Sequence, residues 1–342
     1  MIGINNTNYL TNELITRDSL YTIHRTLGIL PNLNKITLSN SEYIKTLNDV
    51  LNDSHVHSCI QSRKTGTLSM LWKIEPGKNP KLTDLVNHNF RTIDLLGVIS
   101  NILDAIFFGY QVLEIIWKES ELAKLEVQRI ESKPIEWFFY DKDNNLRFRA
   151  RNNPQGEILP VNKFLVPRHN PKYENPYGEA LLGKCFWAVT IKNIGLRFWI
   201  NFLEKYGMPL VIGQYTYPPS PEELANLSVR LQELINSQTI ATPSDVNIEI
   251  KDIGQSKSVD LYLQLIKIAN SEISKALLSQ TLTTELDSGS YAASVTHFKV
   301  RREIILGDKF LVEQTINELI ENIAKVNNFE IQNLPKFVLI EQ

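Results

Sequence analysis

The sequence predicts an α+β fold. Its N-terminal half alternates short helical and strand-like patterns, whereas its C-terminal half contains three long apolar helical stretches. A strand, a helix and a second strand are predicted between the first two of these stretches. The chain has 342 residues, and single hydrophobic cores stop growing at about 250–300 residues. We therefore expect more than one domain.

The first part of the chain predicts short helices and a strand. Ser39 and Ser54 are positioned to cap two helices, the second of which ends near Lys64. Apolar and polar residues then alternate over Thr65–Ile74, which predicts a strand. Apolar residues at helical spacing predict a single helix over Phe90–Phe108.

A small antiparallel β unit is predicted next, because short β-branched and aromatic runs are separated by turn residues. Asp143–Asn145 and Asn153–Gly156 are the predicted turns. The predicted strands are Tyr110–Trp117, Leu125–Ile130, Trp137–Asp141, Leu146–Ala150 and Phe164–Pro167.

Three long helices are predicted in the C-terminal half, over Glu179–Tyr206, Val259–Leu278 and Ala292–Val326. The first is apolar on nearly all sides, so it is expected to be buried on several sides. Neighbouring subunits would supply that burial. The polar stretch Gln280–Ser290 predicts a loop between the second and third helices.

The element between the first two long helices is a predicted strand–helix–strand unit. Its strands are Pro209–Tyr217 and Val246–Ile253. Ser220 and Glu223 have the spacing of a capping box, and Pro221 suits the first turn of the helix that follows.

Composition limits the function classes. The formal net charge is -2, so the chain lacks the basic balance of proteins that grip DNA phosphates. Cys59 and Cys185 are the only cysteines, which favours a reducing cytosol over a disulfide framework. The sequence shows neither a secretory signal at Met1–Leu10 nor an uncharged apolar stretch of membrane-spanning length.

No catalytic or metal motif is present. The sequence has no phosphate-binding glycine loop, no nucleophile elbow and no zinc-type spacing. His55, His57 and Cys59 alternate, but on the predicted helix that spacing points them apart. Cys185 is expected to be a core thiol. We therefore expect no enzyme activity, no cofactor and no metal.

Three further polar sites have ordinary structural interpretations. Glu114 lies in an apolar strand, where a solvent-facing position is favoured over a catalytic one. The threonines of the Gln280–Ser290 loop have no base to activate them. Arg301 and Arg302 could contact phosphate, but on a long helix they are favoured as surface or ion-pair residues.

Four segments in order together resemble the portal proteins of Mu-like bacteriophages, between about Arg17 and Asn328. They are Phe108–Trp117 with its Gly-Tyr-x-x-x-Glu-x-x-Trp pattern, Asn162–Phe164 with Asn175–Gly178, Phe198–Pro209 with its Tyr-Gly-x-Pro turn, and Gln280–Thr284 with Gly289, Ser290 and His297.

The resemblance implies a portal fold with named parts. These are a mixed α/β wing (1–177), a first stem helix (178–207), a clip (208–257), a second stem helix (258–279), a tunnel loop (280–290) and a long wing helix with a truncated or absent C-terminal crown (291–342). The chain ends soon after Asn328, where such proteins usually continue into the crown.

The resemblance also implies a function and partners. Twelve copies would form a ring at a capsid vertex in the virion, assembled in the cytoplasm of the bacterial host. The ring would pass double-stranded DNA without sequence specificity, and would dock the terminase large subunit, the capsid and scaffold proteins and the head–tail connector proteins. The tunnel-loop residues expected at the DNA channel are Thr281, Thr283, Thr284, Ser288 and Ser290. The residues expected at the oligomer interface are Phe186, Trp187, Phe198 and Trp199.

Two other functions were weighed. A nuclease or other hydrolase needs clustered carboxylates and a metal, and the sequence contains no such cluster. A non-ring-forming adaptor or remnant protein of a degraded prophage stays as the alternative to the portal interpretation.

Overall fold

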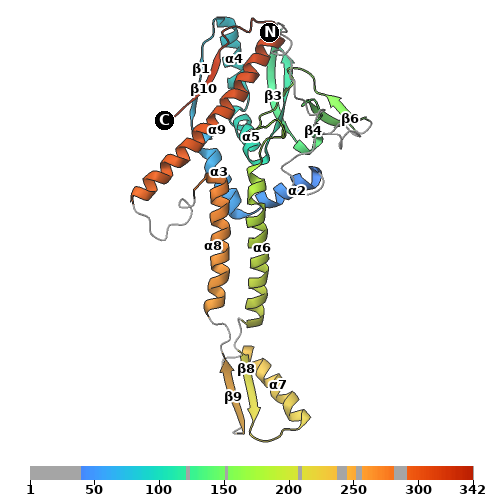
Figure 1. Ribbon diagram of the computed structural model, residues 1–342, viewed down its shortest axis with the longest axis vertical. Helices are drawn as coiled ribbons and strands as arrows, with labels where there is room; N and C mark the ends of the chain where they lie inside the picture. The colour runs from blue at the N-terminus through green and yellow to red at the C-terminus, as the bar shows by residue number, and fades with distance from the viewer. Residues whose placement is uncertain are drawn as a thin grey trace, which may run out of the picture. The chain divides into compact units, whose positions relative to one another are not determined.

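The computed structural model describes residues 40–120, 124–150, 153–206, 210–236, 245–251, 256–280 and 291–341. The chain forms two compact units, one of residues 1–186 with 274–342 and the other of residues 187–273. Figure 1 shows the helices and strands of both units along the chain. In the first unit the helices are α2 (Asn40–Leu51), α3 (Ser54–Leu68), α4 (Pro80–Thr92), α5 (Leu95–Phe108) and α9 (Tyr291–Val326).

The core of the first unit forms around α5 and the second half of α9. Helix α5 is apolar along almost its whole length, and Val98, Ile102 and Ile106 are buried. Helix α9 buries one face between Val312 and Ala324 and contacts α3, α4 and α5. Each buried aliphatic side chain of this kind contributes about 1.5–3 kcal/mol relative to an exposed one. The burial of two helices therefore provides much of the stability of this unit.

The predicted helix over Phe90–Phe108 is wrong as a single helix. The structure has α4 and α5, which are separated at Ile93 and Asp94. The Asp94 carboxylate accepts a hydrogen bond from the backbone N–H of Gly97 at 3.0 Å and so caps the second helix. The apolar spacing continues across the break, which explains why periodicity alone did not reveal it.

The predicted strand over Thr65–Ile74 is also placed too early. Helix α3 is capped by Asp53 and continues to Leu68, and β1 covers Leu71–Glu75. Helix α3 buries Thr67 beyond the predicted end. Tertiary packing against α9 therefore overrides the local alternation in this segment.

The β unit consists of two antiparallel three-stranded sheets. One has the strand order β3–β2–β7 and the other β4–β5–β6. A short 3₁₀ helix, η2 (Ile135–Trp137), leads directly into β4. The strands are β2 (Val112–Glu119), β3 (Leu125–Lys133), β4 (Phe138–Tyr140), β5 (Leu146–Ala150), β6 (Asn153–Ile158) and β7 (Phe164–Leu165).

Strand β6 corrects the predicted turn at Asn153–Gly156. The turn-like features exist, because the Asn153 side chain accepts from Gln155 N–H and donates to the Gly156 carbonyl. They lie within an irregular strand, however, whose pairing with β5 shifts register between Phe148 and Ala150. Asn and Gly therefore mark a distorted strand here rather than the end of one.

Two glycines bring distant segments together in the first unit. Gly109 ends α5 with φ 94°, and Gly178 has φ 75°. A Cβ on Gly109 would lie 2.9 Å from the Tyr177 carbonyl oxygen, so the backbones can approach only because both residues lack side chains. Tyr110 and Tyr177 pack edge to face beside this contact, with ring centroids 5.6 Å apart.

One edge of the C-terminal strand β10 (Lys336–Ile340) pairs antiparallel with β1. The other edge forms hydrogen bonds with side chains of α9. The Asn317 side chain accepts from Phe337 N–H at 2.9 Å and donates to the Phe337 carbonyl at 3.2 Å. The Glu313 carboxylate accepts from Leu339 N–H at 2.8 Å. Helix side chains therefore replace a neighbouring strand along this edge.

The second unit contains most of α6 (Leu181–Tyr206) and of α8 (Ser256–Leu278), with a hairpin and a helix between them. Strands β8 (Leu210–Tyr215) and β9 (Val246–Lys251) pair antiparallel. Helix α7 (Pro221–Asn236) begins with the predicted capping box: Ser220 N–H donates to Glu223, and Glu223 N–H donates to the Ser220 hydroxyl. Within the described ranges, every helix is too short or too polar to cross a lipid bilayer.

We expect Asn317→Ala to loosen β10 selectively. The substitution removes both hydrogen bonds to Phe337 and should reduce the free energy of unfolding by about 1–3 kcal/mol. Hydrogen exchange at Phe337 should accelerate, while exchange in β2 stays unchanged. As a control, Asn317→Asp keeps an acceptor for Phe337 N–H and should cause a smaller acceleration. Equal exchange in all three proteins would contradict this assignment.

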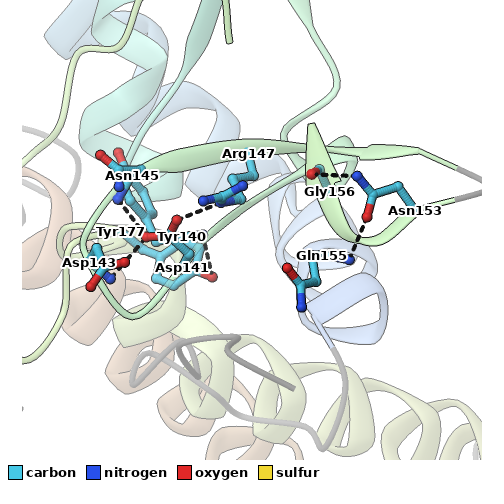
Figure 2. A network of polar contacts seen from close by, with 9 residues as sticks. All are labelled: Tyr140, Asp141, Asp143, Asn145, Arg147, Asn153, Gln155, Gly156 and Tyr177. Atoms are coloured by element: carbon cyan, nitrogen blue, oxygen red, sulfur yellow. Dashed lines mark hydrogen bonds and ion pairs between the residues drawn. The ribbon is translucent and has the colours of Figure 1, made fainter. Parts of the chain in front are cut away.

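Asp141, in the turn between β4 and β5 (Figure 2), should make the free energy of unfolding depend on pH. Burial alone raises the pKa of Asp141, but bonds from Arg147 and from the Asn145 and Asp143 amides outweigh it and hold that pKa below its usual range. The resulting stabilisation is present above the unfolded pKa, about 3.9, and is lost as pH falls through the lower folded pKa. The stability deficit of Asp141→Asn in urea titrations should therefore be larger at pH 7 than at pH 3. Asp143→Asn, at an exposed position, is the control that should show little dependence.

Candidate functional site

Helices α6 and α8 contact each other through side chains within the second unit. Gly195 faces the Leu265 side chain so closely that an added Cβ would collide with it. Farther along the helices, the rings of Phe202 and Tyr262 lie 6.1 Å apart. The absence of a side chain at Gly195 makes room for Leu265, and the aromatic pair adds a second apolar contact between the helices.

Helix α6 also carries an exposed apolar stripe, which we call the α6 stripe: Trp187, Ile191, Ile194 and Phe198. Their spacing of four, three and four residues places them on one face of the helix. Trp187 is 68% exposed and Phe198 is 60% exposed. Four large apolar side chains at helical spacing on one exposed face are typical of an interaction surface.

Helix α8 also exposes apolar residues. Leu261 and Ile268 lie seven residues apart on one face and are 66% and 62% exposed. The sequence predicts apolar residues on this helix, but it cannot tell which of them face α6. The structure buries Ala269 and Ile273 instead.

The predicted interface residues fall into two groups. Trp187 and Phe198 are exposed in the single copy, whereas Phe186 and Trp199 are partly buried. The indole Nε1 of Trp199 is buried and has no hydrogen-bond acceptor among the described residues. Ile191 and Ile194 were not among the predicted interface residues, although their spacing from Trp187 and Phe198 could have indicated them.

The end of α8 is held by α3 and α9 within the first unit, at what we call the Arg63 cluster: Arg63, Leu277 and Asp308. The Arg63 guanidinium donates two hydrogen bonds of 2.7 Å to the Asp308 carboxylate and one of 2.7 Å to the Leu277 carbonyl. The Arg63 and Asp308 side chains are only 10% and 5% exposed. A planar guanidinium can satisfy both partners at once, which an ammonium could not do with the same geometry.

Two residues earlier on α3, His55 and Cys59, form a second contact with α8. His55 Nε2 lies 2.8 Å from the Ser274 hydroxyl, and Cys59 Sγ lies 3.9 Å from it. Burial raises the pKa of the Cys59 thiol, although the Ser274 hydrogen bond lowers it in part. These contacts therefore make α3 a support for the last turns of α8.

The Arg63 cluster lies at the start of the predicted loop. Helix α8 ends at Leu278, Ser279 adopts a φ of 53°, and Gln280 is buried. The five predicted channel residues Thr281, Thr283, Thr284, Ser288 and Ser290 lie outside the described residues. Their predicted role therefore stays a prediction, while the anchoring of the residues before them is observed.

The residues weighed for metal binding do not form a metal site. His55, His57 and Cys59 lie on α3 as predicted. In the described part of the chain, no group of three or more His, Cys, Asp or Glu side chains is placed to hold an ion. Cys185 is buried, as predicted for a core thiol, and burial raises its pKa to about 12. A thiol of that pKa is a poor nucleophile at neutral pH.

Three other charged residues have partners. Glu114 is partly buried, rather than solvent-facing, and forms ion pairs with Lys133 at 2.9 Å and Lys163 at 3.5 Å. Burial opposes its ionisation, but the two lysines hold its pKa below the usual range. Arg302 pairs with Glu341, and Arg301 donates to the Ser62 carbonyl at 3.0 Å. Arg302 is therefore an ion-pair residue as predicted, whereas the half-buried Arg301 bonds a backbone carbonyl and the predicted solvent-facing position of Glu114 is wrong.

The exposed α6 stripe is the kind of apolar surface that another protein usually covers. Residues 44–342 match the family described as "Portal protein of Mu bacteriophage". The chain therefore belongs to the Mu bacteriophage portal protein family, which confirms the resemblance and the predicted α+β portal fold.

Two curated relatives and one solved structure are similar to this chain. The portal protein of Escherichia phage Mu is 27% identical over 84% of this chain and 58% of its own length. The Mu-like prophage FluMu protein gp29 of Haemophilus influenzae is 24% identical over 83% of this chain and 57% of its own length. A chain from the virion of a native gene transfer agent particle has a TM-score of 0.61 and 11% identity, covering 86% of this chain and 83% of that chain. The chain thus spans less than two thirds of the length of these curated relatives.

We expect Asp308→Asn to be strongly destabilising. It leaves the buried Arg63 guanidinium without its counter-charge, which typically costs about 3–5 kcal/mol. The free energy of unfolding from urea titration provides the measurement. Glu341→Gln, which removes the charge partner of the exposed Arg302, is the matched control and should have little effect. Equal losses in the two variants would show that the Arg63 cluster has no special role.

Proposed function

We propose that this chain forms a portal ring at the capsid vertex of a bacteriophage or prophage particle. The observation that carries the proposal is the family match over residues 44–342. The ring would be a conduit for double-stranded DNA during packaging and ejection. The role is mechanical, and it requires no catalytic residue or cofactor.

The proposed parts of the subunit follow the predicted boundaries. They are a wing (1–177), a first stem helix (178–207), a clip (208–257), a second stem helix (258–279), a tunnel loop (280–290) and a long wing helix (291–342). The two proposed stem helices correspond in sequence to α6 and α8, and the proposed clip contains β8, α7 and β9.

A ring requires two different faces on each subunit, because its contacts are head-to-tail. The α6 stripe is the proposed first face, and the exposed Leu261 and Ile268 of α8 belong to the proposed second face. Burying one exposed aliphatic or aromatic side chain contributes about 1.5–3 kcal/mol before the entropic cost of association. Repetition of this contact at every subunit boundary would close the ring, for which we propose twelve copies.

The proposed channel is lined by the tunnel loop, with Thr281, Thr283, Thr284, Ser288 and Ser290 facing the DNA. Neutral hydroxyl side chains can form hydrogen bonds without strong attraction to phosphate. The formal net charge of -2 supports this proposal, because many Lys or Arg contacts to phosphate would hold the DNA in place. A conduit must let it slide.

The proposed partners follow from the same assembly. The clip would dock the terminase large subunit during packaging and the head–tail connector proteins afterwards. The wing would contact the capsid and scaffold proteins. The ring would assemble in the bacterial cytoplasm and remain in the virion.

The proposal predicts that the purified full chain forms rings with a central channel in electron micrographs. Ile191→Glu and Phe198→Glu place charges in the α6 stripe and should reduce the ring fraction at least about tenfold, because each loses more than 1.4 kcal/mol per interface. Native mass spectrometry would measure the loss of oligomer.

Leu224→Glu is the matched control, since Leu224 is 53% exposed on α7, outside the stripe. It should form rings as the original chain does. A stable monomer under all conditions, including with capsid protein present, would favour the alternative of a non-ring-forming adaptor or prophage remnant. Rings of normal yield in both stripe variants would place the interface elsewhere.

A further inference from the structure

Helix side chains close some strand edges of the first unit and leave others open. Asn327 accepts from the Leu125 N–H and donates to the Leu125 carbonyl, and Asn89 accepts from the Val127 N–H. These contacts occupy the outer edge of β3. An unpaired edge offers its N–H and C=O groups to any extended chain, so an edge that stays open is a candidate contact surface.

The direction of the backbone groups in β10 follows from its contact with α9. The N–H and C=O of Phe337 and the N–H of Leu339 bond side chains of α9. Because backbone groups alternate in direction along a strand, those of Val338 point the other way, toward β1. Val338 is paired with Lys73, and these two residues therefore exchange hydrogen bonds.

Strand β1 consequently has an open edge. Since Lys73 bonds β10, the N–H and C=O groups of its neighbours Trp72 and Ile74 point away from β10. In the described part of the chain, β1 pairs with no strand other than β10, and the backbone groups of Trp72 and Ile74 have no other partner. These groups are available to a further strand.

The direction of the backbone groups in β5 follows from the turn that precedes it. Asp141 N–H donates to the Asn145 carbonyl at 3.0 Å, so the backbone groups of Asn145 point toward β4. Alternation along the strand turns those of Phe148, three residues later, toward β6, where Phe148 pairs with Glu157. The backbone groups of Ile158, the next residue of β6, therefore point away from β5.

Strand β6 thus has an open edge at Ile158. Among the described residues, the N–H and C=O of Ile158 have no partner on that side. The Gly156 carbonyl is already used, because it accepts from the Asn153 side chain (Figure 2). Glu157 is exposed and has no ion-pair partner within 4.0 Å in the described ranges.

The two open edges lie on opposite sides of the first unit. In the view of Figure 1, β1 is on one side and β6 is on the other, with α9 and β3 between them. A ring needs two different surfaces on each subunit, because its contacts are head-to-tail. A symmetric contact between two β1 edges would close a dimer and could not continue around a ring.

We propose that the β1 edge of one copy pairs antiparallel with the β6 edge of the next copy, so that one sheet crosses the subunit boundary. This inference rests on the proposed ring and deepens it by naming a contact between the first units of neighbouring copies. Trp72 of one copy exchanges backbone hydrogen bonds with Ile158 of the next, which is how an added strand usually gains affinity.

Charge selects the register of this pairing. With Trp72 opposite Ile158, Lys73 stands opposite Glu157. A shift of the pairing by two residues would place Glu75 opposite Glu157 instead. Opposite charges across a strand pair are stabilising and like charges are destabilising. Lys73 pairs with Glu75 in the single copy, but both side chains are about half exposed, 51% and 47%, and leave Lys73 accessible to Glu157.

The same contact covers exposed apolar residues on both edges. Leu71 and Ile340, which are paired with each other, are 57% and 39% exposed. Beside the other edge, Ile158 is 73% exposed and Val161 is 86% exposed. In the proposed register Leu71 stands opposite Leu159. Large apolar side chains beside open edges promote aggregation of single copies, whereas pairing buries them at every boundary.

Charge reversal in the full chain tests the register. Lys73→Glu and Glu157→Lys each place like charges opposite one another at every boundary, so each should reduce the ring fraction in native mass spectrometry at least about tenfold. The double variant restores the pair with exchanged signs and should form rings as the original chain does. Lys81→Glu, at an exposed position of α4, is the matched control and should leave the ring fraction unchanged.

Disulfide trapping tests the contact directly. The variant with both Lys73→Cys and Glu157→Cys should give a ladder of covalent multimers on oxidation, because directly opposite residues have Cβ atoms about 4.5–5.5 Å apart. Each single cysteine variant should give no ladder, since Cys59 and Cys185 are buried. Rings that show no ladder and no response to charge reversal would overturn the pairing and leave the proposed function intact. If the original chain forms no ring, the proposed function fails, and the pairing fails with it.

Discussion

The buried ion pair between Arg63 and Asp308 connects the main helices of the first unit. One guanidinium joins α3 to α9 through Asp308 and to the end of α8 through the Leu277 carbonyl. Burying two charges is costly, and it is tolerated because three short hydrogen bonds compensate them. This geometry defines where α8 ends and where α9 lies. The apolar half of α9 then packs on α3, α4 and α5, while its polar side chains complete the edge of β10.

In the second unit, several large apolar residues are exposed to solvent and not buried in a core. Helix α6 packs on α8 at Gly195 and leaves Trp187, Ile191, Ile194 and Phe198 in solvent. One copy cannot cover every side of a helix that is apolar nearly all round. The same excess of apolar surface that would destabilise a monomer in solution becomes the driving force for assembly in the proposed ring.

Sequence reasoning succeeded where a local signal has a local physical cause. The capping box at Ser220 and Glu223 satisfies backbone groups within one turn, so its residues alone identify the start of α7. It failed where neighbours in space decide. The break between α4 and α5 depends on an Asp94 cap inside a continuous apolar pattern, and β6 retains the side-chain hydrogen bonds of a turn within a strand.

Some features of the candidate site could likewise be predicted from the sequence, and others could not. From its residues the chain could be recognised as α+β, with three long helices, a strand–helix–strand unit and a buried Cys185, because periodicity and residue type report burial directly. The partners of Arg63 lie more than two hundred positions away in the chain, and no local pattern records such a contact. Which apolar residues of α6 and α8 face each other, and which remain in solvent, was likewise decided only by the tertiary structure, because a helix that is apolar on every side carries no signal for direction.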